Sequence, residues 1–129
     1  MYDGCYKVNT QALSWIDASI AAVQQNASLV SIHSEPQSRW LTEHLHNVGM
    51  WSGNLWLGLN QIAEQDVWRY TDGSPFDFTR WPSPPAASVR CVAYAADTRW
   101  FGDQCSVGKP SLLKWNESAE QLPEGKTSQ

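Results

Sequence analysis

Apolar and polar positions divide the chain into an early part with helical spacing and a later part with strand spacing. In the later part, residues 55–59 form an apolar run of strand length, and residues 67–70 are aromatic and alternating. These segments predict two strands joined by a loop. Residues 71–75 combine an Asp-Gly pair with a proline, which is typical of a turn. The irregular segment predicted after it, residues 73–88, keeps aromatic residues at Phe76, Phe78 and Trp81.

Two helices are predicted in the early part. Ser14 is placed to cap the first, with Asp17 three residues later to favour the first turn, and the helix covers residues 15–25. Its apolar stripe comprises Trp15, Ala18, Ala22 and Val23. Ser34 and Gln37 have the spacing of a capping box, which predicts a second helix that ends at residues 47–49. Its apolar face comprises Trp40, Leu41 and Leu45.

The remaining apolar runs predict further strands, at residues 5–8, 29–32, 89–96, 98–100 and 111–115. Two helices followed by a run of strands make an α+β domain, which we assign to residues 4–115. Residues 116–129 are polar, with Glu, Gln, Pro, Gly, Lys, Thr and Ser, and are predicted to form a C-terminal tail or linker.

Length and charge limit the classes of partner. A chain of 129 residues fits one domain. The formal net charge of -4 and a pI near 5.2 argue against nucleic acid and anionic membranes, whose recognition needs a basic face. No apolar run is long enough to cross a bilayer, and residues 1–4 lack the features of a secretion signal. If the protein is extracellular, we expect this sequence to be a mature or excised fragment.

Several motifs occur together in the order found in one family. Residues 56–59 read Trp-Leu-Gly-Leu, residues 68–75 lead to Trp81, and Cys91 precedes the segment 100–105. This arrangement resembles C-type lectin-like domains over roughly residues 5–114. The resemblance implies a C-type lectin-like fold with two helices, antiparallel sheets and a long loop region. It also implies an extracellular module, secreted or part of an ectodomain, that recognises a ligand.

The three cysteines lack the close paired spacing of a zinc finger or ribbon. The resemblance implies a disulfide between Cys91 and Cys105. It also places Ala22 and Leu113 where the family's other usual disulfide lies, so both halves of that bridge are absent together, whether naturally or by engineering. Cys5 is expected either to stay a thiol that truncation has left unbridged, or to form an intermolecular bridge in a disulfide-linked or tandem-domain parent.

The resemblance allows a test for calcium, which takes six to eight oxygen ligands. The family's ligand positions are here occupied by residues without a suitable side-chain oxygen: Pro84, Pro85, Ala86, Val89, Arg90, Phe101 and Gly102. Four carboxylates lie in the same region, at Asp72, Asp77, Asp97 and Asp103. Scattered carboxylates are usually solvated, and Asp72 beside Gly73 suits a turn. We therefore expect no cofactor and no metal site, with calcium-dependent sugar binding lost.

Enzyme motifs such as a serine elbow, a phosphate-binding glycine loop or a nucleophile beside a base are missing from the sequence. His33, His44 and His46 are interpreted as surface residues, and the last two cannot share a metal because they lie two apart on a predicted helix. Sequence spacing leaves a pair of catalytic carboxylates open. We expect a non-catalytic protein. Two sequons predict N-glycosylation, at Asn26 and Asn116.

A protein ligand is favoured over a glycan because aromatic and arginine residues gather at the loop end. The candidate contacts are Phe76, Phe78, Arg80, Arg90 and Phe101. Trp81 and Trp100 are assigned to the core, and the competing interpretation assigns Phe76 and Phe78 to it as well. The alternative ligand is an anionic or sulfated glycan that arginines, including Arg99, bind without calcium.

Overall fold

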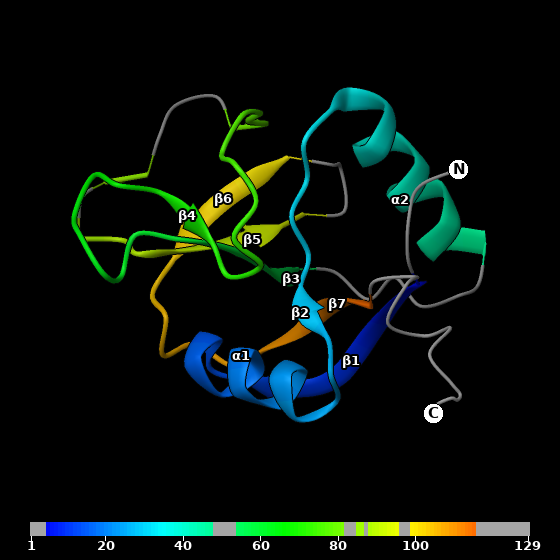
Figure 1. Cartoon of the computed structure of the whole chain (residues 1–129), viewed down its shortest axis with the longest axis horizontal. Helices are drawn as coiled ribbons and strands as arrows, with labels where there is room; N and C mark the ends of the chain where they lie inside the picture. The colour runs from blue at the N-terminus through cyan, green and yellow to red at the C-terminus, as the bar shows by residue number, and fades with distance from the viewer. Residues whose placement is uncertain (1–4, 48–53, 82–84, 87, 96–98, 116–129) are drawn as a thin grey trace.

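The structure is a computed structural model that describes residues 5–47, 54–81, 85–86, 88–95 and 99–115. The elements in chain order are β1 (Cys5–Leu13), α1 (Trp15–Gln24), β2 (Ser28–Leu29), α2 (Glu35–Asn47), β3 (Leu55–Asn60), β4 (Arg69–Tyr70), β5 (Cys91–Tyr94), β6 (Trp100–Asp103) and β7 (Lys109–Trp115). The predicted α+β class with two helices is confirmed (Figure 1). None of the helices in this part of the chain is long and apolar enough to cross a membrane.

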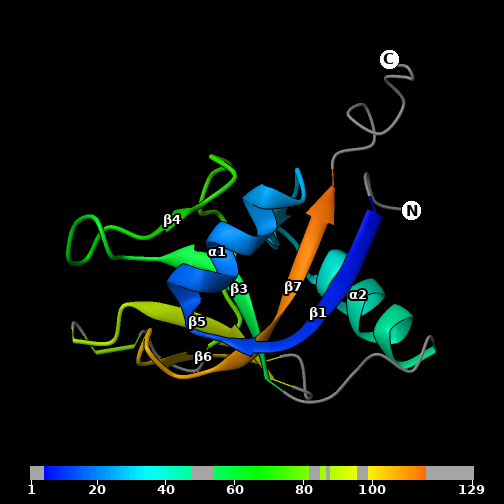
Figure 2. The same ribbon diagram turned by 90° about the horizontal axis from the view of Figure 1, so that it is seen from below.

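The strands form one sheet in the order β1-β7-β3-β5-β6, with β2 paired to β7 and β4 to β3. β1 and β7 lie side by side along their lengths, which brings the two ends of the described chain together (Figure 2). β3 runs parallel to β7, with Trp56 opposite Ser111, and the other pairs are antiparallel. The sheet is therefore mixed, whereas antiparallel sheets were expected.

β3 is the central strand and is buried on both sides. Leu55, Leu57 and Leu59 belong to one apolar cluster and Trp56 to another, because successive side chains point to opposite sides of a strand. Gly58 lies between them, and a side-chain carbon there would be 3.0 Å from the carbonyl oxygen of Leu29. The continuous apolar run is thus explained by burial on two faces rather than one.

Each helix covers one of these clusters. The α1 face comprises Trp15, Ala18, Ala22, Leu29, Trp56, Cys91, Ala93 and Leu113. The α2 face is larger and includes Val8, Ile32, Leu41, Leu45, Leu57, Val92, Tyr94, Trp100 and Leu112. Figure 2 shows α1 and α2 on opposite sides of the β1–β7 pair.

The caps of both helices were predicted, with one difference in detail. Ser14 Oγ accepts a hydrogen bond from the backbone N–H of Asp17 at 3.2 Å, and Ser34 Oγ accepts one from that of Gln37 at 3.2 Å. In a capping box, the Gln37 side chain would bind the backbone N–H of Ser34. It accepts instead from the N–H of His33, at 2.7 Å. This bond fixes the backbone of His33 at the start of α2.

Other sequence predictions were wrong in their details. Val23 is 68% exposed rather than part of the buried stripe, because Ala18 and Ala22 already fill the narrow side of α1 that meets the sheet. Residues 29–32 are buried as predicted, but only Ser28–Leu29 is strand. The backbone N–H of Val30 donates to the carbonyl of Leu112, and its carbonyl accepts from the N–H of Gly58, so it bonds two different strands outside a regular ladder. The partner of β5 was predicted at residues 98–100; the observed strand begins at Trp100, after Arg99, and continues to Asp103, while residue 98 lies outside the described residues.

Candidate functional site

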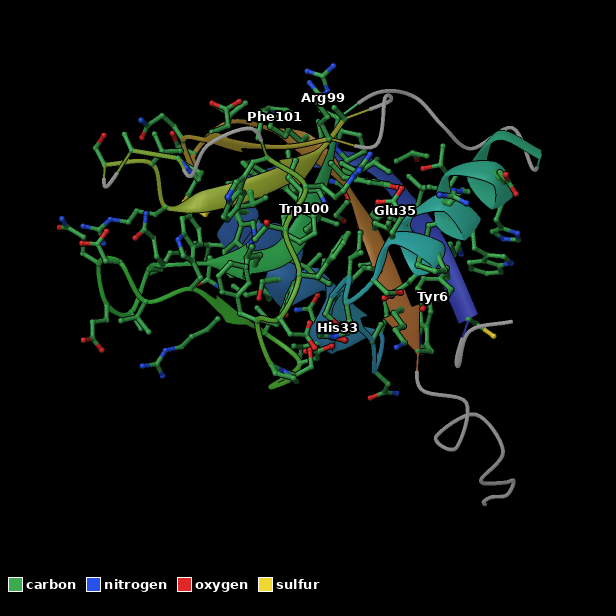
Figure 3. All side chains as sticks on the ribbon, turned by 90° about the horizontal axis from the view of Figure 1, so that it is seen from above. Tyr6, His33, Glu35, Arg99, Trp100 and Phe101 are labelled. Atoms are coloured by element: carbon green, nitrogen blue, oxygen red, sulfur yellow. A yellow bond between two sulfur atoms is a disulfide. The ribbon has the colours of Figure 1, made fainter. Side chains whose placement is uncertain are left out.

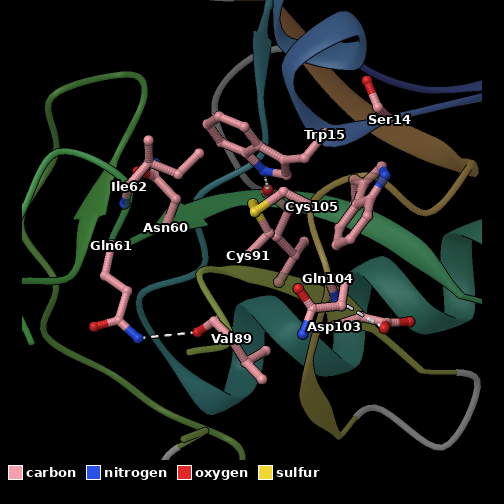
Figure 4. Close-up of a disulfide and its surroundings, with 12 residues drawn as sticks. Ser14, Trp15, Asn60, Gln61, Ile62, Val89, Cys91, Asp103, Gln104 and Cys105 are labelled. Carbon is pink, nitrogen blue, oxygen red and sulfur yellow. Dashed lines mark hydrogen bonds between the residues drawn. A yellow bond between two sulfur atoms is a disulfide. The ribbon is translucent and has the colours of Figure 1, made fainter. Parts of the chain in front are cut away.

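A disulfide fixes the base of the long loop, which is the irregular segment predicted at residues 73–88. The disulfide joins Cys91 to Cys105 with a sequence separation of 14, as predicted (Figure 4). Trp15 fastens α1 beside it, since its backbone N–H donates to the carbonyl of Cys105 and its Nε1 to that of Leu57, each at 2.8 Å. Cys5 is exposed at the start of β1, outside this bridge.

Ala22 and Leu113, the positions predicted to have lost a second bridge, both lie in the α1 face. Each is only 1% exposed. Their side chains fill this part of the core with hydrocarbon. The loss of a second disulfide at these positions stays a prediction.

Three segments that the resemblance associates with calcium meet in the structure, where Pro85 and Val89 lie against Gly102. A side-chain carbon at Gly102 would lie 2.6 Å from Cγ1 of Val89 and 2.7 Å from Cβ of Pro85. Gln61 holds this region in place, because its Nε2 donates to the carbonyl of Val89 at 2.9 Å and its backbone N–H to that of Arg90 at 2.9 Å (Figure 4). The side chains that meet here offer carbon where calcium would need oxygen.

The nearby carboxylates have other partners. Asp103 lies 2.9 Å from the ammonium of Lys109, and this hydrogen bond lowers the pKa of the carboxyl. The ammonium also lies 5.3 Å from the ring centre of Trp56 and 5.2 Å from that of Phe101. Asp97 lies outside the described residues.

The aromatic candidates form a connected group around Trp81 on the α2 face. The ring of Trp81 lies 5.4 Å from Trp68, 6.0 Å from Phe76 and 5.6 Å from Trp100. Trp100 is buried, as predicted, and Trp81 packs against the α2 face while partly exposed. Phe78 packs on Trp100 at 5.9 Å and is partly buried. Phe76 is 37% exposed and is the candidate aromatic most open to a ligand.

Two open clefts border this aromatic group. One, of about 440 Å³, lies between β4 and the loop and is lined by Trp68, Arg69, Tyr70, Gly73, Ser74, Pro75 and Phe76. The other, of about 360 Å³, is lined by Thr79, Arg80, Trp81 and Arg99. Arg80 is held at 2.9 Å by Glu35 at the start of α2. Sequence reasoning missed Trp68 and Glu35, since their neighbours lie far along the chain.

Phe101 does not join the other aromatic candidates. It follows Trp100 in β6 and therefore points to the opposite side of the sheet, where it packs against the α1 face. Figure 3 shows Phe101 and His33 far apart, on either side of Trp100. The predicted contact residues are thus distributed over two faces of the domain.

His33 was interpreted as a surface residue, but the structure places it in a polar network. Its Nδ1 lies 2.7 Å from Oδ1 of Asp77, and its Nε2 lies 3.1 Å from the hydroxyls of both Ser31 and Ser74. The two hydroxyls donate to the carboxylate of Asp72, which also accepts the backbone N–H of Ser74, as expected of a turn residue. Burial raises the pKa of Asp72, but the bonds from Ser31 and Ser74 outweigh it and hold the pKa below its usual value.

The two predicted glycosylation sites differ in what can be described. Asn26 is exposed just after α1, with a φ of 62°. Asn116 lies outside the described residues. Glycosylation of either asparagine stays a prediction.

Comparisons with known proteins agree with this fold. The family model described as the lectin C-type domain matches residues 11–112. C-type mannose receptor 2 of Homo sapiens is 30% identical over an alignment of 129 positions, and this alignment covers 94% of this chain and 8% of the receptor. The chain therefore spans only a small part of this relative.

Among solved structures, a calcium-independent type II antifreeze protein superposes with a TM-score of 0.79 at 24% identity, over 90% of this chain and 88% of its own. A Ca2+-dependent type II antifreeze protein, in its Ca2+-free form, gives a TM-score of 0.76 at 28% identity, over 88% and 94%. The same fold is thus found in proteins described as calcium-independent and as calcium-dependent.

Proposed function

Because the chain belongs to the C-type lectin domain family, we propose that it is a non-catalytic extracellular recognition module that binds a protein partner without calcium. The family is described as a lectin domain, and the similar human protein is named a receptor. These similarities support a general role in recognition. The partner and the independence from calcium are inferred from this chain's own residues.

The proposed independence from calcium is supported by one observation, that Pro85 and Val89 pack directly over Gly102. The fold brings together the segments that the resemblance associates with calcium, and what meets there is hydrocarbon. Asp103, the nearest described carboxylate in sequence, is bound to Lys109. These residues do not fit a calcium ion, which needs several converging oxygens.

The proposed contact surface is the cleft between β4 and the loop. Phe76 is exposed at its edge, while Trp68 forms part of its wall. Arg69 adds a guanidinium that lies 3.5 Å from Glu64, on a side chain that is 59% exposed. Exposed aromatic residues beside arginine are typical of the anchors of protein interfaces. Phe78, being partly buried, positions this surface rather than contacting the partner.

A second candidate ligand is an anionic glycan, and the cleft lined by Arg80 and Arg99 favours it. Glu35 orients the guanidinium of Arg80, which reduces the entropy lost when an anion binds. Sulfate or carboxylate groups of a glycan match guanidinium groups in geometry and charge.

The test is a binding screen against two arrays, one of secreted and cell-surface ectodomains and one of glycans, each with calcium and with EDTA. We expect ectodomain binding that survives EDTA, is lost in Phe76→Ala and is retained in Val23→Ala, which shortens another exposed apolar side chain, on α1. Binding restricted to sulfated glycans and abolished by high salt would favour the second candidate. Binding lost in EDTA would contradict both.

A further inference from the structure

The outer side of α1 exposes a row of apolar side chains. Ile16, Ile20 and Val23 are 46%, 49% and 68% exposed. Their spacing of four and three residues places them on one side of the helix, away from the residues that meet the sheet. Figure 1 shows α1 at the lower edge of the molecule. We call these three residues the outer stripe.

The composition of α1 makes this exposure unusual. Among its ten residues, the polar ones are Asp17, Ser19 and Gln24, and Asp17 alone is charged. A helix that is apolar on all sides is normally covered on all sides. Single apolar residues on a surface need no explanation, but a continuous row of branched ones favours contact with another group. The outer stripe is therefore expected to be covered in the protein's natural surroundings.

Asn26 stands at the end of the outer stripe and begins one of the two sequons, in which Ser28 supplies the hydroxyl. Asn26 is exposed, and its backbone N–H donates to the carbonyl of Val23 at 3.0 Å. Its φ of 62° is the left-handed conformation that asparagine adopts readily after a helix. This backbone alone would account for an asparagine, but it does not require Ser28, which lies beyond the cap in β2. The sequon and the stripe are thus contiguous.

We propose that Asn26 carries an N-linked glycan that lies over the outer stripe and shields it from other molecules. In the modification, Nδ2 of Asn26 loses a proton and bonds to the anomeric carbon of an oligosaccharide carried on a lipid diphosphate. The bond between that carbon and the diphosphate oxygen breaks, and the lipid diphosphate leaves with the bonding electrons and takes up the proton. This donor belongs to the secretory pathway, so the proposal rests on the extracellular location proposed above.

The size and chemistry of a glycan suit the stripe. From Ile16 to Val23 the stripe extends about 10 Å along the helix, at about 1.5 Å per residue, which a few sugars can span. The faces of pyranose rings present C–H groups to Ile20 and Val23, while hydroxyl groups at the ring edges stay in water. Asp17 lies at the opposite end of α1 from Asn26, so no charge has to lose its water where the first sugars lie.

A second copy of the chain suits the stripe less well. Stable protein interfaces bury about 800 Å² on each partner, which is more than three side chains provide. The proposed ligand surface also lies elsewhere, because Phe76 packs on Trp81, on the other face of the sheet. The outer stripe is thus a surface to be shielded rather than one that recognises a ligand.

The test compares matched variants of the chain, secreted from mammalian cells and measured without ligand. Ser28→Ala removes the sequon and leaves Asn26 in place, whereas Ser28→Thr keeps the sequon. Mass spectrometry before and after glycosidase treatment measures occupancy of Asn26, which we expect in the wild type and in Ser28→Thr. Oxidation by hydroxyl radicals, located by mass spectrometry, measures the exposure of Ile20 and Val23. We expect it to be at least about twofold faster in Ser28→Ala, because a glycan is bulky enough to cover both side chains.

Three controls accompany this comparison. Ile62, which is 37% exposed in the loop after β3, is an internal reference whose oxidation should not change. Asn116→Gln removes the other sequon and should leave the oxidation of the stripe unchanged. Enzymatic release of the glycan from the folded wild-type protein should reproduce the effect of Ser28→Ala, so the result does not depend on the folding of a variant.

An unoccupied Asn26 in the secreted wild type, or equal oxidation of the stripe with and without the glycan, would overturn the proposal. Self-association of the glycosylated protein that Val23→Ser abolishes would also overturn it, and would assign the stripe to a second copy. Each of these outcomes leaves recognition through Phe76 intact, since no ligand is present. A partner screen without any ligand would contradict the proposed function without bearing on Asn26.

Discussion

The two faces of the sheet are held together by different kinds of interaction. The α1 face contains the disulfide, small alanines and a buried tryptophan whose ring nitrogen is bonded to the backbone of β3. The α2 face supports an irregular segment through aromatic rings and through the polar network of His33. The disulfide and the apolar contacts change little with pH, whereas the hydrogen bonds of ionisable groups depend on it. The comparison suggests that stability is concentrated on the α1 face and adaptable recognition on the α2 face.

Removing the disulfide should have the largest effect on stability. Replacing Cys91 and Cys105 together with alanine should lower the free energy of unfolding by about 3 kcal/mol, as expected for a closed loop of this length. Urea denaturation measures the change. Cys5→Ala, at an exposed position, is the control and should change stability by less than about 0.5 kcal/mol. A loss below about 1 kcal/mol in the double variant would mean that packing alone holds the α1 face.

Two neighbouring phenylalanines should separate stability from recognition. Phe78→Ala should lower the free energy of unfolding by about 2 kcal/mol, because this ring packs on buried Trp100. Phe76→Ala should leave stability nearly unchanged and weaken binding of the identified partner by about 2 kcal/mol or more. Thermal denaturation and calorimetric titration of the same two proteins provide both numbers. Equal loss of stability in both variants would assign Phe76 to the core.

A smaller effect is expected at acidic pH. The pKa of Asp72 is lower in the folded protein, so the carboxylate stabilises the fold above the pKa of the unfolded chain, near 4, and this contribution is lost as the pH falls through the folded value. The side chain is exposed, so we expect no more than about 1 kcal/mol. Asp72→Asn should be less stable than wild type at pH 7 and should approach it below pH 3. A difference that grows towards acid pH would contradict this account.

Calcium should have the smallest effect. A ligand that binds only the folded state raises the melting temperature, by several degrees for a tight site at millimolar concentration. Because Pro85, Val89 and Gly102 supply no oxygen ligand, we expect melting temperatures in calcium and in EDTA that agree within about 1 °C. A clear increase with calcium would mean that other carboxylates form a site.

Much of the local structure could be predicted from the sequence. Ser14 and Ser34 marked the starts of both helices, and the apolar run of β3 marked the central strand, because caps and periodicity depend on residues within a few positions of one another. The resemblance supplied the Cys91–Cys105 pair. The position of Asp72 in a turn followed from the adjacent glycine.

The candidate site could be predicted only in part. The sequence grouped Phe101 with Phe76 because both lie in the later, aromatic part of the chain, yet strand alternation after buried Trp100 turns Phe101 to the α1 face. It identified His33 as an ordinary surface residue. The partner of that histidine, Asp77, lies 44 positions away in an irregular loop, where no periodicity relates the two residues.

The sequence by itself determined which segments become helix, strand and turn, since backbone propensity, capping and side-chain period act between near neighbours. The tertiary structure alone decided that β3 runs parallel to β7 and that Pro85 and Val89 close over Gly102. It also decided that His33 contacts Asp77 directly and is linked to Asp72 through two serine hydroxyls. These contacts depend on strand register and on the path of a loop fastened at its base by the disulfide. Both are set by how the two faces pack as a whole, which no local pattern encodes.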